Sequence, residues 1–138
     1  MKSPKLSLMF SAVALVFAVM ACAGVETTPT VSNIRMTTDD TGETPTSTYA
    51  PGDDFFVFAD LSGIEVGSLI QSKWYTVDVQ DLEPNLEINT SDYTYEANIA
   101  YVYFQLSTSE GGDWPPGSYR VELYLDGTKV GEQGFAVR

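Results

Sequence analysis

The C-terminal stretch from Trp114 to Arg138 constrains the fold most, because its residue pattern is that of a β-hairpin. From Tyr119 to Asp126 apolar side chains occupy every second position and mostly polar ones lie between them, as in a strand with one buried face. The turn that follows is Asp126-Gly127, a pair that favours the positive φ angles of a tight primed turn. The chain then returns through a second alternating run, so antiparallel strands are expected.

Further strand-forming runs precede this hairpin. Residues 55–61 are apolar on both faces, which suits a central strand. Residues 69–79 contain Trp74, a candidate core anchor in a domain without a disulfide. A short edge strand is expected around residues 86–88, and residues 93–106 form the longest expected strand. The sequence therefore predicts an all-β fold.

The length of the chain sets its organisation. A chain of 138 residues holds one domain, and the part that follows an N-terminal leader is long enough for a single hydrophobic core. We expect a signal peptide over residues 1–21, a Thr- and Pro-rich flexible tether over residues 22–30 and one β-sandwich domain over residues 31–138. About seven strands are expected in that domain.

The leader has the three parts of an export signal. Lys2 and Lys5 form a short positive region, and residues 6–19 are almost entirely apolar but too few to serve comfortably as a permanent membrane anchor. The next residues, Val19-Met20-Ala21-Cys22, resemble the lipobox of bacterial lipoproteins. This resemblance implies that Cys22 receives a diacylglyceryl group and becomes the mature N-terminus. The expected location is then the cell envelope, outside the cytoplasm and attached to a membrane by lipid.

A second interpretation of the leader stays open. Ala21-Cys22-Ala23 also fits the small-x-small pattern of ordinary signal-peptidase cleavage, which would remove the cysteine and leave a secreted protein. Cys22 is the only cysteine in the chain, so no disulfide is expected in the exported domain under either interpretation.

The charge of the chain is strongly acidic. The full sequence has a net charge of −12, and subtracting the two leader lysines, its only charges, gives −14 for the remainder. Such a field repels phosphate backbones, so nucleic acid is not an expected partner. It attracts cations and basic partners, although the scattered acids are also consistent with simple solubility.

The order of the motifs resembles a known architecture. The sequence runs from a Pro-Gly-Asp-Asp turn through an aromatic strand, a Lys-Trp-Tyr strand and a long strand to the Trp-Pro-Pro-Gly-Ser-Tyr strand, Asp-Gly and a closing Phe-x-Val strand. Residues 31–138 resemble the immunoglobulin-like antiparallel β-sandwiches of bacterial exported and lipid-anchored proteins. Tyr119 resembles the tyrosine corner of such domains. The resemblance implies a fold and no particular activity, because these sandwiches have many functions.

The residues needed for common catalytic chemistry are missing. The sequence has no histidine, which removes the commonest general base and the commonest zinc ligand. A single cysteine allows no thiolate cluster, and no glycine-rich phosphate loop is present. Nineteen carboxylates make acidic pairs easy to find and uninformative. We therefore expect no enzyme activity, no cofactor and no metal site.

Aromatic side chains on the outward positions are the remaining functional signal. Phe56, Phe58, Tyr101, Tyr103 and Tyr124 all fall opposite the expected core face of their strands. If these strands are neighbours, the three tyrosines form a candidate surface for a protein or a polysaccharide. The alternative is that segment 37–51 or cross-strand aromatic pairs cover the rings, which the two phenylalanines favour.

Two functions are consistent with these features. The first is a membrane-tethered, non-catalytic recognition or accessory module outside the cytoplasm. The second is a structural subunit of an exported complex that pairs through a sheet edge or through the aromatic face. The expected partners are a membrane, through the N-terminal lipid, and another envelope protein or a polysaccharide.

Overall fold

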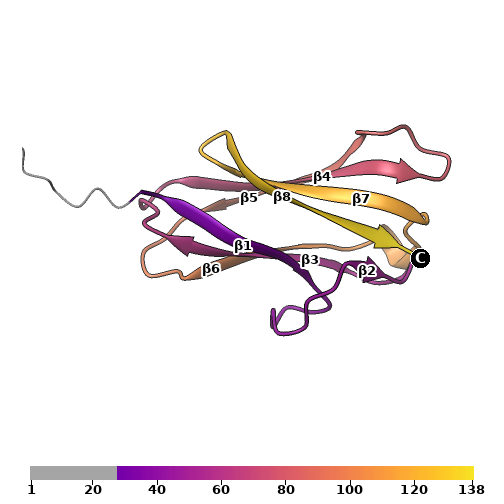
Figure 1. The fold of residues 1–138 in the computed structure, drawn as a ribbon, viewed down its shortest axis with the longest axis horizontal. Coiled ribbons are helices and arrows are strands. Elements are labelled where there is room, and N and C mark those ends of the chain that lie inside the picture. The colour runs from indigo at the N-terminus through magenta and orange to yellow at the C-terminus, as the bar shows by residue number, and fades with distance from the viewer. Residues whose placement is uncertain (1–27) are drawn as a thin grey trace, which may run out of the picture.

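The computed structural model describes residues 28–138, which form two β-sheets packed face to face (Figure 1). The leader, Cys22 and residues 23–27 of the expected tether lie outside the described residues. The strands are β1 (Thr30–Thr37), β2 (Thr48–Tyr49), β3 (Phe55–Ser62), β4 (Leu69–Val79), β5 (Glu87–Thr94), β6 (Tyr101–Leu106), β7 (Gly117–Leu125) and β8 (Thr128–Val137). A short 3-10 turn, η1, spans Ser109–Gly111. Within the described residues, no helix has the length and apolar character needed to cross a membrane.

Three strands form one sheet and five strands form the other. One sheet has the order β1-β3-β6 and the other has the order β2-β8-β7-β4-β5. All pairs are antiparallel except the short pairing of β2 with β8. The expected all-β sandwich is confirmed, with eight strands in place of about seven because the two-residue β2 adds one. β1 begins at the end of the sandwich opposite to the end where β8 finishes (Figure 1).

The core between the sheets is built largely from aromatic rings. Trp74 of β4 is 1% exposed, as expected of a core anchor, and its indole N–H donates to the Ser72 hydroxyl at 3.1 Å. Phe55 of β3 lies 4.6 Å, centroid to centroid, from both Trp114 and Phe135. Burying large rings on both inner faces supplies the hydrophobic free energy that a domain without disulfides needs.

The terminal hairpin has the predicted geometry. Asp126 and Gly127 have φ angles of 48° and 82°, and Leu125 pairs with Thr128 across the turn. Two successive positive φ angles define a type I′ turn, whose twist matches that of the flanking strands. At the start of the same hairpin the Tyr119 hydroxyl donates to the Pro115 carbonyl at 2.6 Å, which is the hydrogen bond of a tyrosine corner.

The expectation of one long strand over residues 93–106 is wrong. The chain leaves the five-stranded sheet at the end of β5, crosses to the other sheet and starts β6 at Tyr101. Asn98 lies in the crossing with a φ angle of 67°, a conformation that asparagine tolerates better than most residues. The short edge strand expected near residue 87 is β5, and it extends to Thr94.

Candidate functional site

The outward-facing tyrosines lie on two different faces of the sandwich. Tyr101 and Tyr103 belong to β6 in the three-stranded sheet, whereas Tyr124 belongs to β7 in the five-stranded sheet. The structure therefore brings Tyr101 and Tyr103 together and separates Tyr124 from them. The alternation of a strand predicts which side chains point outward, but not which sheet the strand joins.

Tyr101 and Tyr103 pack their rings against two buried phenylalanines of β3, and we call these four residues the outer aromatic patch: Phe56, Phe58, Tyr101 and Tyr103. Phe58 is paired in register with Tyr103, and their rings stack at 5.1 Å with an interplanar angle of 18°. The Tyr101 ring stacks on Phe58 at 5.9 Å. Tyr101 and Tyr103 are 53% and 41% exposed, so the tyrosines form the accessible part of the patch.

The phenylalanines of the patch are covered, as their lack of a polar tip suggests. Phe58 is 1% exposed, and the Arg35 guanidinium lies 5.3 Å from its ring centroid. A Cβ atom on Gly42 would come within 2.8 Å of the Phe58 ring, so the loop after β1 lies directly on it. The prediction that segment 37–51 and cross-strand pairing cover the rings is therefore confirmed for Phe58. Tyr101 and Tyr103 remain accessible to solvent.

β6 also lies at the edge of its sheet. The amide of Leu61 donates to the carbonyl of Ala100 at 2.8 Å, which fixes the alternation of the antiparallel ladder between β3 and β6. In that alternation the backbone groups of Val102 and Phe104 point toward β3. Those of Tyr101, Tyr103 and Gln105 point away from it. The outer aromatic patch thus continues into an edge with backbone donors and acceptors directed outward.

A groove of about 480 Å³ runs beside this edge. Besides Tyr101 and Tyr103, its walls include Tyr93 of β5, Ile99 of the β5–β6 crossing and Val102. These side chains are largely apolar and come from both sheets. The groove, the edge and the exposed tyrosines form one contiguous feature of the fold.

The outer face of the five-stranded sheet has a different chemistry. Its centre is an outer polar network made of Lys73, Tyr75, Arg120, Glu122, Tyr124, Lys129 and Glu132. Glu122 is only 7% exposed, and its carboxylate accepts from Arg120 at 3.0 Å and from the Tyr124 hydroxyl at 2.7 Å. Lys129 lies 3.7 Å from the same carboxylate.

Cation–π contacts complete the outer polar network. The Lys73 ammonium lies 4.6 Å from the centroid of the Tyr124 ring, and the Arg120 guanidinium lies 4.4 Å from that of Tyr75. Rings and cations at these distances attract each other through the ring quadrupole. Tyr124 is therefore engaged at its ring and at its hydroxyl, unlike Tyr101 and Tyr103.

The protonation behaviour of the network follows from these contacts. Burial on its own would raise the pKa of Glu122, but hydrogen bonds from Tyr124 and Arg120 and the charges of Lys129 and Arg120 hold that pKa below its ordinary value. The hydrogen bond to Glu122, followed by burial, raises the pKa of Tyr124 to about 12. Both groups are held in the protonation state that keeps the network paired at neutral pH.

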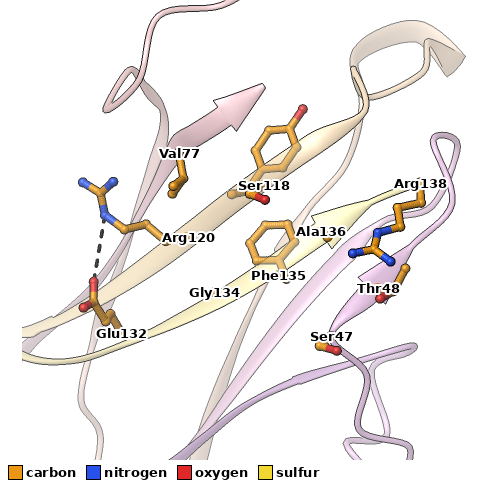
Figure 2. A pocket seen from close by; sticks show the side chains of 11 residues that line it. Ser47, Thr48, Val77, Ser118, Arg120, Glu132, Gly134, Phe135, Ala136 and Arg138 are labelled. Atoms are coloured by element: carbon orange, nitrogen blue, oxygen red, sulfur yellow. Dashed lines mark ion pairs between the residues drawn. The ribbon is translucent and has the colours of Figure 1, made fainter. Parts of the chain in front are cut away.

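A shallow depression of about 490 Å³ lies on this same face, at the end of the sheet where β8 finishes (Figure 2). Figure 2 shows Arg120 and Glu132 paired at one side of it, with Arg138 and Thr48 at the other side and Gly134 and Ala136 between them. Among residues 28–138, no buried side-chain nitrogen or oxygen lacks a hydrogen-bond partner. The depression therefore presents no buried polar group directed at a ligand.

Comparison with known proteins addresses the fold. No family model and no curated protein matches the sequence. An immunoglobulin-like protein from Pseudomonas aeruginosa is similar in structure, with a TM-score of 0.59 and 15% identity over 83% of this chain and 100% of that chain. The fold is that of an immunoglobulin-like β-sandwich.

The immunoglobulin-like sandwich also matches a part of larger enzymes. A β-glucosidase from Listeria innocua, solved in complex with laminaribiose, gives a TM-score of 0.52 at 14% identity and covers 81% of this chain. Only 16% of that enzyme is matched. Likeness at such low identity concerns the fold alone, because sandwiches of this kind occur in proteins with unrelated activities.

The sequence predicts one part of this candidate site, the outward phase of two tyrosines, and not the rest. It indicates Tyr101 and Tyr103 but gives no sign that β6 ends the sheet, because sheet order is set by contacts between distant strands. Nor does it indicate Glu122, whose alternation with apolar neighbours looks like that of any outward acid. Within residues 28–138, no three acidic, histidine or cysteine side chains are grouped so that they could hold a metal ion.

Proposed function

We propose that this protein is a lipid-anchored, non-catalytic binding module that contacts another envelope protein through the outer aromatic patch and the adjoining edge of β6. The observation that carries this proposal is the pair of exposed tyrosines, Tyr101 and Tyr103, on an edge strand. Amphipathic rings of this kind are enriched where proteins bind one another, because they bury a large area and keep a polar tip.

The leader supports the anchoring part of the proposal. Its positive start, its apolar run and Ala21-Cys22 are the features of a lipidated export signal. β1 starts at one end of the sandwich, so an anchor that precedes it would hold the domain by that end. β6 runs along the length of the domain and would lie to the side, accessible to a neighbouring protein.

The non-catalytic part of the proposal is supported by the residue inventory. The chain has no histidine, and its one cysteine lies at the lipidation motif. The most buried carboxylate of the domain, Glu122, has its charge balanced by Arg120 and Lys129. A carboxylate whose pKa is held low by two cations is a poor general acid or base at neutral pH.

A second candidate is a permanent subunit of an exported complex. The uncharged sequence of β6, Tyr-Val-Tyr-Phe-Gln-Leu, favours it, because a bare edge strand is a ready template for pairing with another chain. The two candidates share one surface and differ in the lifetime of the contact.

Anchoring and binding have separate tests. Metabolic labelling with a tagged fatty acid is expected to mark the natural chain and not Cys22→Ser, and an unlabelled natural chain in the medium would overturn the anchor. For binding, the membranes of the producing cells are treated with a cross-linker and the chain is isolated with its partners. Tyr103→Ser is expected to lose a partner that Tyr124→Ser keeps. Equal recovery with both variants would refute the binding surface.

A further inference from the structure

The edge of β6 differs from the other sheet edges of the described residues in lacking the usual protections against an added strand. β1 carries an irregularity between Ser32 and Arg35, where Asn33 has a φ angle of 50°. β2 has only two residues, and β5 carries Glu87 and Asp92 among polar neighbours. Bulges, short strands and charges are the usual protections against edge-to-edge pairing. β6 has none of them.

From this difference we infer that β6 accepts an extended, basic segment of the partner protein as an additional strand of the three-stranded sheet. The inference rests on the proposed function and specifies the chemistry of the partner. The outward backbone groups of Tyr101, Tyr103 and Gln105 supply the hydrogen bonds of such a strand. This is the recognition mode in which main-chain bonds give affinity and alternate side chains give specificity.

The groove beside β6 determines the side chains that the added strand needs on one face. Its apolar walls include Tyr93, Ile99 and Val102. Successive side chains of a strand point to opposite sides, so every second residue of the segment would face this groove. Aliphatic or aromatic residues at those positions would bury apolar surface there.

The charge around β6 determines which side chains the added strand needs at its other positions, those that do not face the groove. Between Lys73 and Arg120 the sequence contains no lysine or arginine, and it contains eight acids: Asp78, Asp81, Glu83, Glu87, Asp92, Glu96, Glu110 and Asp113. This stretch includes β5, β6 and the loops that flank them. Beside β6 itself, the Gln105 side-chain amide donates to Asp54 at 2.9 Å, and Asp60, which also pairs with Arg35, is in register with Tyr101. A segment with lysine or arginine at alternate positions would therefore be attracted to this region.

A second copy of this chain fits the same edge less well. It would bring an equally acidic stretch against the first, so the two would repel each other. Antiparallel pairing of two β6 strands would also place the two β1 starts at opposite ends of the dimer. Two lipid anchors that precede β1 would then attach at opposite ends of such a dimer.

The test uses the full chain in a non-ionic detergent and a synthetic seven-residue peptide of alternating valine and lysine. Amide hydrogen exchange followed by NMR is expected to slow at least tenfold at Tyr101, Tyr103 and Gln105 when the peptide is added. The amides of Val102 and Phe104 already face β3, so their exchange rates are expected to remain unchanged. A valine–glutamate peptide is the charge control and is expected to give no protection.

A peptide with N-methyl groups at alternate residues isolates the backbone contribution without changing the protein. Its affinity is expected to be at least tenfold weaker, and equal affinity would overturn strand addition. In the protein, Tyr103→Val removes the ring and keeps the backbone amide, so it serves as the reference for a variant that lacks both, and it is expected to bind the valine–lysine peptide at least tenfold more tightly than that variant. Tyr103→Pro removes the amide and is expected to lose binding, provided that its melting curve shows a folded domain.

The outcomes separate this inference from the proposed function. If Tyr103→Ser loses the cellular partner while N-methylation has no effect, the aromatic patch binds without strand addition and this inference fails alone. If neither binding of the peptide nor recovery of the cellular partner depends on β6, both this inference and the proposed function fail. Protection of Tyr101, Tyr103 and Gln105 in the chain alone, accompanied by a dimer in sedimentation, would assign the edge to a second copy and overturn the basic partner.

Discussion

The two outer faces of the sandwich use similar residues in opposite ways. On the five-stranded sheet, Tyr75 and Tyr124 are engaged by Arg120 and Lys73, and their neighbours form ion pairs around Glu122. On the three-stranded sheet, tyrosines stack on a covered phenylalanine and present their remaining surface to solvent. One face satisfies its polar groups internally, and the other leaves rings and an edge available.

This contrast shows what makes an outward aromatic residue a binding candidate. Strand phase alone makes Tyr103 and Tyr124 equivalent, since both lie opposite the core. Their contacts distinguish them: the Lys73 ammonium lies over the Tyr124 ring and Glu122 accepts from the Tyr124 hydroxyl, whereas the Tyr103 ring stacks on Phe58. A ring already held by a cation and a hydrogen bond would have to exchange those contacts for new ones on binding.

The largest expected effect concerns the covered ring under the exposed tyrosines. Phe58→Ala is expected to lower the free energy of unfolding by about 3–5 kcal/mol, because it removes a fully buried ring and leaves a cavity under the loop at Gly42. Chemical denaturation measures this change. A loss below about 1 kcal/mol would mean that the patch is open throughout and that the tyrosines have no fixed support.

The cover itself can be tested with two glycines that share a positive φ angle. Gly42→Ala is expected to cost about 2–3 kcal/mol, because its Cβ would clash with Phe58 in addition to straining the backbone. Gly67→Ala is the matched control, with a φ angle of +91° and no atom within 4 Å of the added Cβ, and is expected to cost about 1 kcal/mol. Equal melting temperatures for the two variants would place the loop away from the ring.

The opposite face is tested by neutralising its central carboxylate. Glu122→Gln is expected to lower stability by about 1–3 kcal/mol at neutral pH, because Arg120 and Lys129 lose a charged partner. Since the pKa of Glu122 is lower in the folded than in the unfolded state, its contribution is complete above the unfolded value of roughly 4.3 and is lost as the pH falls through the folded value. The free energies of unfolding of the natural chain and of Glu122→Gln should therefore converge in acid. A difference between them that stays constant down to low pH would contradict the role of the charge.

How much of this structure can be predicted from the sequence depends on whether a feature is set by residues close together in the chain or by pairings between distant strands. The type I′ hairpin, the buried Trp74 and the outward phase of Tyr101 and Tyr103 depend on residues close together in the chain, and sequence patterns predict them. The division of residues 93–106 between two sheets depends on distant pairings, and Asn98 was its only local sign. The separation of Tyr124 from the β6 tyrosines has the same origin.

The smallest expected effect distinguishes the accessible part of the patch from its support. Tyr101→Ser is expected to change stability by only about 0.5 kcal/mol, because more than half of the side chain is exposed. Thermal denaturation of Tyr101→Ser and Phe58→Ala, measured in parallel, compares the two losses of stability. A loss comparable to that of Phe58→Ala would show that Tyr101 is part of the core and unsuited to binding.

Site-specific photo-cross-linking compares the two faces most directly. A photoreactive phenylalanine analogue is placed at Tyr103 in one variant and at Tyr124 in another, and both are irradiated in the producing cells. The account predicts a discrete covalent adduct with an envelope protein from position 103 and none from position 124. An adduct from position 124 alone, or equal adducts from both positions, would contradict it.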